Sequence, residues 1–243
     1  MSSRYKDERE AYQGKRIEEL KDSKASNERI RFFEELIIFN ELIKALVKWK
    51  KKTNKQTERD ILKDLSFVPV MKCLYVNSLI SVNLKRKHRK NSLFNIYNYE
   101  AFPKGPLNKD SYYFMDKLPE YTIQKDENIE YLSPRYSEES SAQPNFSDLI
   151  NQLSNQIGIS LNNNEQSLVQ SNLTRYSIML NKAVRELKKA SSFPEFRERE
   201  RLIDLTHMNL WKEGMEKYDS EMNTSRRKEL IDEACFFRWR IGL

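Results

Sequence analysis

The feature that most constrains the fold is a run of apolar side chains between residues 29 and 49 that covers two faces of a helix. One face carries Ile30, Phe33, Leu36, Ile37, Ile43, Leu46 and Val47, and another carries Phe32, Phe39, Leu42 and Trp49. A helix that is apolar on two faces must be covered from two sides. We therefore expect this segment to be the central helix of a helical domain.

Apolar periodicity elsewhere predicts further helices and one small β element. Helices are expected from about Ser66, after Asn108 or Asp110, over Phe146–Ile157, along a stripe from Val169 to Leu187, and twice more before the C-terminus; residues 121–132 alternate as a strand or hairpin does. The fold class is thus mainly α, a single compact helical domain of about seven helices with a small β-hairpin element. Composition divides the chain into a charged helical leader (1–28), a domain (29–214), and a C-terminal helix with an aromatic tail (215–243).

The scarcity of glycine excludes two classes of nucleotide-binding enzyme. The five glycines, at positions 14, 105, 158, 214 and 242, are far apart. Phosphate-binding loops need clustered glycines, so neither a P-loop nor a Rossmann fingerprint is present. The two cysteines and two histidines, Cys73, Cys235, His88 and His207, lack metal-ligand spacing. We expect no metal site and no catalytic constellation.

The N-terminal residues MSSRYKDERE have no apolar core of the kind a secretory signal contains. The segment 65–84 carries a single charge, Lys72, but Pro69, Asn77 and Asn83 favour a buried helix over a membrane span. We therefore expect a cytoplasmic protein without a membrane partner.

The formal net charge of +7 is unevenly distributed along the chain. Residues 29–104 hold 17 basic and 7 acidic side chains, whereas residues 105–170 hold 4 and 10. Such polarity favours steering of a protein partner over general binding of nucleic acid.

Three ordered segments resemble the Panacea domain, the family of SocA-like antitoxins in bacterial toxin–antitoxin pairs. They are Met71–Tyr75 (MKCLY), Tyr99–Leu107 (YEAFPKGPL) followed by Tyr112, and Arg201–Trp211 (RLIDLTHMNLW). The resemblance extends over roughly residues 36–214 and makes Tyr75, His207 and Trp211 structural motif residues. It departs from the family at Leu107, where valine is usual, and in the leader and tail.

The resemblance implies an antitoxin that binds and neutralises a cognate toxin protein, commonly encoded beside it, without catalysis or cofactor. Some relatives deliver the toxin to a protease, and that role stays open here. The turn of Lys104, Gly105 and Pro106, together with Tyr112, is the first candidate partner-binding site. Its preset backbone suits recognition, although a simple chain reversal is an equal interpretation.

Two other segments are candidate contact surfaces. The basic run 85–90, with Arg86, Lys87 and Arg89, suits either a solvated loop, an acidic protein surface or, less favoured, nucleic acid. A nucleic-acid-binding regulator using this run is the alternative function. The tail residues Phe237 and Trp239 have the composition of a binding hot spot, but a terminal helix packed on its own core is the other interpretation. His207 and Trp211, four positions apart on one predicted helix face, are expected to pack structurally rather than to act in catalysis.

Overall fold

The computed structural model describes residues 3–21, 26–54, 57–64, 70–71, 74, 96–97, 100–102, 105–126, 129–136 and 144–189. The chain divides into two compact units, the first formed by residues 1–67 with 110–177 and the second by residues 68–109 with 178–243. Each unit is therefore assembled from two separate stretches of sequence. The boundaries expected from composition, after residues 28 and 214, follow a different criterion and stay predictions.

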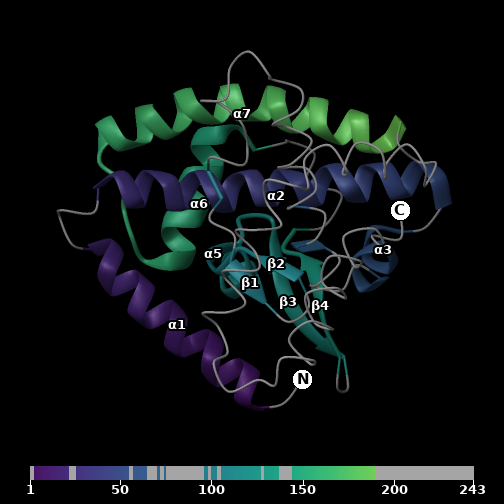
Figure 1. Cartoon of the computed structure of the whole chain (residues 1–243), viewed down its shortest axis with the longest axis horizontal. Coiled ribbons are helices and arrows are strands. Elements are labelled where there is room, and N and C mark those ends of the chain that lie inside the picture. The colour runs from purple at the N-terminus through teal and green to yellow at the C-terminus, as the bar shows by residue number, and fades with distance from the viewer. Residues whose placement is uncertain are drawn as a thin grey trace. The chain divides into compact units, whose positions relative to one another are not determined.

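A long central helix organises the first unit (Figure 1). Helix α2 (Ser26–Asn54) buries all nine residues from Phe32 to Asn40, which agrees with the two apolar faces of its sequence. Around it are α1 (Ser3–Lys21), α3 (Glu58–Asp64), α5 (Lys109–Tyr113), the 3-10 helix η4 (Met115–Lys117), α6 (Phe146–Ile157) and α7 (Asn163–Lys189). Edge-to-face packing of Phe32 against Phe33 and Phe114 fills the core beside α2.

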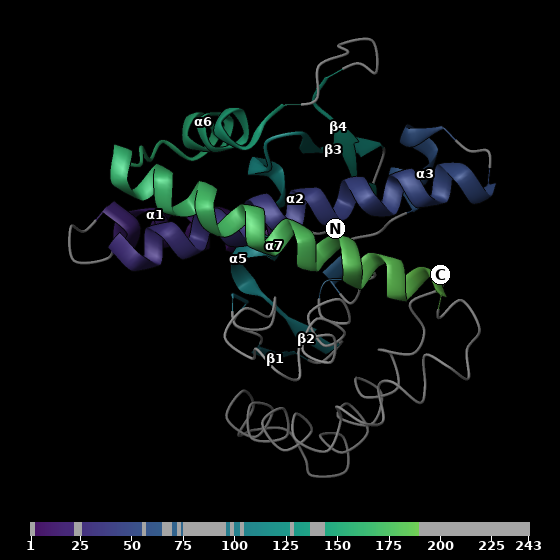
Figure 2. The same cartoon turned by 90° about the horizontal axis from the view of Figure 1, so that it is seen from above.

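The first part of α7 runs beside α2 in both views (Figures 1 and 2). Two side-chain contacts set their relative direction: Arg29 of α2 contacts Glu165 of α7, and Glu34 contacts Asn172 further along both helices. The two helices are therefore parallel. Val169 and Leu173 of the predicted apolar stripe are fully buried, so this stripe faces the core of the unit.

Two antiparallel hairpins make up the β structure of the described residues. In the first unit, β3 (Tyr121–Asp126) pairs with β4 (Ile129–Pro134), and Asp126 lies opposite Ile129. In the second unit, β1 (Glu100–Phe102) pairs with β2 (Gly105–Leu107). Tyr131 and Leu132 of β4 are buried, and Lys63 of α3 lies 5.0 Å from the centre of the Tyr131 ring.

Capping residues explain why α6 begins and ends where it does. The Asn145 side chain accepts a hydrogen bond from the backbone N–H of Asp148, whose carboxylate accepts one from the N–H of Asn145. At the other end Gly158 adopts a φ of 70° and donates its N–H to the carbonyl of Ser154. This reciprocal cap and left-handed glycine satisfy backbone groups that a helix leaves unpaired at its ends.

The mainly α fold class with a small β-hairpin element, expected from the sequence, is confirmed for the described residues. The helix predicted over Phe146–Ile157 has those bounds, and the hairpin predicted over residues 121–132 is present as β3 and β4. No helix in the described ranges has the length and apolarity needed to cross a membrane.

Candidate functional site

Three of the residues singled out from the sequence lie in described elements. Gly105 and Pro106 belong to β2, and the half-buried Tyr112 belongs to α5, with its ring centre 5.2 Å from that of Tyr113. The others fall outside the described residues: Tyr75, Arg86, Lys87, Arg89, Lys104, His207, Trp211, Phe237 and Trp239. Their proposed roles stay predictions.

The turn expected at residues 101–106 is the end of the β1–β2 hairpin. Phe102 pairs with Gly105, so the two strands are joined across positions 103 and 104. Gly105 thus lies in an arm of the hairpin, at the start of β2.

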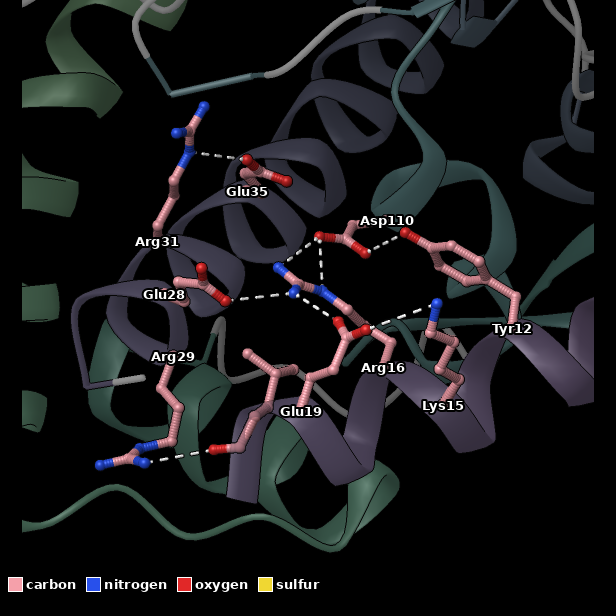
Figure 3. A network of polar contacts seen from close by, with 10 residues as sticks. Tyr12, Lys15, Arg16, Glu19, Glu28, Arg29, Arg31, Glu35 and Asp110 are labelled. Carbon is pink, nitrogen blue, oxygen red and sulfur yellow. Dashed lines mark hydrogen bonds and ion pairs between the residues drawn. The ribbon is translucent and has the colours of Figure 1, made fainter. Parts of the chain in front are cut away.

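The most extensive polar cluster of the described residues joins the leader helix to α5 (Figure 3). The Arg16 guanidinium donates from Nε and Nη2 to Oδ2 of Asp110, both at 3.3 Å, and the Tyr12 hydroxyl donates to Oδ1 at 2.9 Å. Nη1 of Arg16 also donates to Glu19 at 3.1 Å and to Glu28 at 3.3 Å. Arg16 therefore connects α1, α2 and α5 through one side chain.

Neighbouring residues of α1 extend the same contact. Nε2 of Gln13 donates to the carbonyl oxygen of Tyr113 and to Oδ1 of Asp116, each at 2.7 Å. The Tyr12 ring stacks on the Tyr113 ring with centres 4.6 Å apart. Further toward the N-terminus, Arg9 of α1 lies 3.9 Å from Glu130 of β4. One side of α1 thus packs against α5, η4 and β4 within the first unit.

Burial and neighbouring charges have opposite effects on the pKa values of Asp110 and Arg16 in this cluster. Burial raises the pKa of the Asp110 carboxyl, while the charge of Arg16 and the hydrogen bond from Tyr12 limit that rise. Burial also disfavours the charged form of Arg16, but the Asp110 charge and the bond to Glu19 outweigh it and raise the pKa of the guanidinium. Arg16 and Asp110 each favour the charged form of the other, so removing one partner makes the charged form of the other less favourable.

A second polar contact fixes the start of α7 against α2. The buried Glu165 accepts hydrogen bonds from Arg29 at 2.6 Å and from Ser26 at 2.7 Å through Oε1. Its Oε2 accepts from the backbone N–H of Asn162, whose side chain accepts in return from the N–H of Glu165. Burial alone would raise the pKa of Glu165, but these hydrogen bonds outweigh it and lower the pKa.

The polar pairs in these two clusters hold helices of the same unit against one another. No group of three or more potential metal ligands occurs within the described residues. Carboxylates are paired with arginine, amide or tyrosine groups that come from other elements, and the pairs join α1, α2, α5 and α7. Because these pairs connect separate helices of the same unit, they fix how α1, α2, α5 and the start of α7 pack together.

The contact between α1 and Asp110 could have been anticipated from the helical spacing of polar residues, but not from the spacing of apolar ones. Arg9, Gln13, Arg16 and Leu20 are separated by four, three and four positions, so they share one face of α1. That face is mostly polar, and a search for an apolar stripe passes over it. The sequence predicts Asp110 only as a possible helix cap, whereas its carboxylate receives Arg16 and Tyr12.

The sequence matches no protein-family model, and no curated protein or solved structure is significantly similar to it.

Proposed function

We propose that this protein is a cytoplasmic antitoxin of the Panacea type that binds a cognate toxin directly and covers its active site, without catalysis. The observation that carries the proposal is the order of elements over residues 100–113. A hairpin with a two-residue connection is followed by a short helix that holds Tyr112. A turn leading into a helix with a tyrosine is the most recognisable of the three segments that resemble the family.

The charge pattern supports a protein partner. The block of residues 29–104, which ends at Lys104, has 17 basic and 7 acidic side chains, and the block that follows is acidic. A toxin with an acidic surface beside its active site would be drawn toward the basic block, whereas the acidic block would repel the uniformly negative backbone of a nucleic acid. The proposed contact residues are Lys104, Gly105, Pro106 and Tyr112, with the basic run 85–90 and the tail residues Phe237 and Trp239 as further contacts.

Co-expression with the product of the adjacent gene tests this function. We expect that product to arrest growth alone, to be harmless when this protein is present, and to co-purify with it. A neighbour that is harmless alone, or that stays lethal and does not co-purify, contradicts the proposal. If instead the purified protein shifts its promoter DNA in a salt-dependent way that requires residues 85–90, the alternative role as a nucleic-acid-binding regulator is favoured.

A charge reversal in the first hairpin tests the contact itself. We expect Lys104→Glu to weaken toxin binding by about tenfold or more, since a charge at an interface centre is placed opposite its complement. The matched control is Lys125→Glu, an exposed lysine near the tip of the other hairpin, with the same change in charge. Equal effects of the two variants in a pull-down titration would show that the first hairpin is not part of the interface.

The role as a protease adaptor has its own test. If co-expression of this protein lowers the amount of toxin in cells, and the decrease requires a cellular protease, this protein delivers the toxin for degradation.

A further inference from the structure

We propose that one exposed face of α7 binds the same face of a second copy of this chain, so that two molecules pair about a twofold axis. We call it the neutral face; it consists of Asn164, Ser167, Leu168, Ser171 and Thr174. All five residues belong to the first unit. The pairing does not rest on the proposed function, because it involves no toxin.

The surface around the neutral face carries no charge, although 33% of the residues in the chain are charged. Every residue from 149 to 174 is described, and the twelve exposed ones are asparagine, glutamine, serine, threonine, glycine or leucine. The ionisable side chain in that range, Glu165, is buried and bound to Arg29. Charged residues are depleted at the centres of protein interfaces, because burying a charge costs free energy. The composition therefore favours an interface over an ordinary solvated surface.

Leu168 is the apolar centre of the neutral face, with 52% of its surface exposed. Two hydroxyl groups of the face already have acceptors within α7. Ser167 donates its hydroxyl to the carbonyl of Asn163 at 2.8 Å. Thr174 donates in the same way to Gln170 at 3.1 Å. Burying these two hydroxyls against a partner therefore leaves neither donor unpaired, so the face loses little when it is covered.

The neutral face has the spacing of a helix that packs against another helix. Its residues are separated by three, one, three and three positions, so they form a stripe along one side of α7. Val169 and Leu173, on the other side of the helix, are buried in the core of the unit. Helix α7 thus has two sides with packing geometry, of which one is buried and the other is exposed.

Two features favour a second copy of the chain as the occupant. Amide and hydroxyl groups each carry a donor and an acceptor, so a face made of them is complementary to itself, whereas a charged face repels its own copy. The chain has a formal net charge of +7, so two copies repel one another except where uncharged surfaces meet. A twofold axis through the middle of the neutral face brings the two Leu168 side chains close together.

Sedimentation velocity of the full chain at a series of protein concentrations measures the pairing. One helix face about 15 Å long provides less than the roughly 800 Å² that each partner of a stable dimer buries, so we expect a dissociation constant on the order of 100 µM. Raising NaCl from about 50 to about 500 mM should tighten the pairing about twofold or more, because salt screens the repulsion between two positively charged copies.

A charge placed at the centre of the face tests its location. We expect Leu168→Glu to weaken the pairing about tenfold or more, because two carboxylates then meet near the axis. The matched control is Tyr136→Glu, since Tyr136 is also 52% exposed but lies outside the neutral face. Leu168→Lys alone should weaken the pairing as well. An equal mixture of the Leu168→Glu and Leu168→Lys proteins should associate again, because opposite charges then meet.

The proposal is overturned if the wild-type protein stays monomeric at about ten times the expected dissociation constant. It is also overturned if Leu168→Glu and Tyr136→Glu associate alike, or if the mixture of the two Leu168 variants associates no better than either one alone. Weaker pairing at high salt would assign the contact to charged surfaces instead. A monomeric wild type whose capture of the adjacent gene product is lost in Leu168→Glu would assign the neutral face to that partner.

Discussion

Glu34 is an ionisable side chain within the continuously buried segment Phe32–Asn40 of α2. It lies on the central helix with 5% of its surface exposed, and its Oε1 accepts a hydrogen bond from Nδ2 of Asn172 at 2.7 Å. Burial raises the pKa of Glu34 to about 7, while Asn172 and the charge of Arg31 limit that rise. The folded protein therefore holds a proton on Glu34 at pH values where the unfolded chain has released it.

The pH dependence of stability follows from that difference. Between the ordinary pKa of 4.5 and about 7, the folded state binds more protons than the unfolded state, so the contribution of Glu34 to the free energy of unfolding falls as the pH rises. We expect Glu34→Gln, which keeps an acceptor for Asn172, to be more stable than wild type above pH 7 by roughly 1–3 kcal/mol. Below pH 4.5 the two proteins should be equally stable.

Urea unfolding at pH 4.5 and pH 8 measures this effect. The control is Glu10→Gln, because Glu10 lies on the exposed side of α1 and forms an exposed pair with Lys6. A Glu34→Gln protein that is less stable than wild type at pH 8 would contradict the raised pKa that burial gives to Glu34.

The polar residues of α2 also show where prediction from sequence stops. The apolar periodicity between residues 29 and 49 correctly indicates a central helix. It indicates no partner for Glu34 or for Asn40, whose side chain donates to Glu120 at 2.7 Å. Those partners are 138 and 80 positions away in the chain. The local spacing of apolar residues indicates which residues are buried. Which polar side chains then form hydrogen bonds with each other depends on how elements distant in the sequence pack together.

At the scale of whole elements, one helix has the bounds that the sequence predicts. Apolar spacing locates the helix Phe146–Ile157, and its bounds coincide with a reciprocal cap at Asn145 and a left-handed glycine at position 158. The sequence predicts the three-residue strands β1 and β2 only as a turn, because strands so short show no alternation. It does not predict which residues of α5 and η4 contact α1, since these contacts are polar and 94 to 103 positions apart.

Two glycine-to-alanine substitutions separate backbone strain at a positive φ from the effect of helix propensity. Gly158 has a φ of +70° and Gly14 lies within α1; a Cβ would meet no atom within 4 Å at either position. We expect Gly158→Ala to lower the free energy of unfolding by about 1 kcal/mol, because alanine resists a positive φ. Gly14→Ala should instead favour α1 by about 0.5–1 kcal/mol, because alanine is the better helix former.

Thermal unfolding of the two variants provides the measurement, with each acting as the other's control. Hydrogen exchange should locate the Gly158→Ala effect in α6 and the Gly14→Ala effect in α1. A decrease in stability of the same size in both variants would argue against the left-handed cap as the cause.

At the scale of the whole molecule, the separation of charge along the chain makes association sensitive to salt. The basic block 29–104 and the acidic block 105–170 differ by 16 in formal net charge, from +10 to −6. We expect the association rate with the adjacent gene product to fall by about tenfold between 50 and 500 mM NaCl, because the Debye length shortens and steering is lost. Stopped-flow binding measures this rate, and a dissociation rate that changes more than the association rate would indicate that charge acts after the encounter.

The parallel packing of α2 and α7 has a consequence for how the chain is made. Arg29 and Glu165 are 136 positions apart, so α2 leaves the ribosome well before the helix that covers its side. At typical rates of synthesis this interval is on the order of ten seconds. Throughout it, the nine-residue segment Phe32–Asn40, which is buried at every position in the folded protein, has no α7 to cover it. The order in which these two helices appear therefore leaves an apolar surface open to chaperones during synthesis.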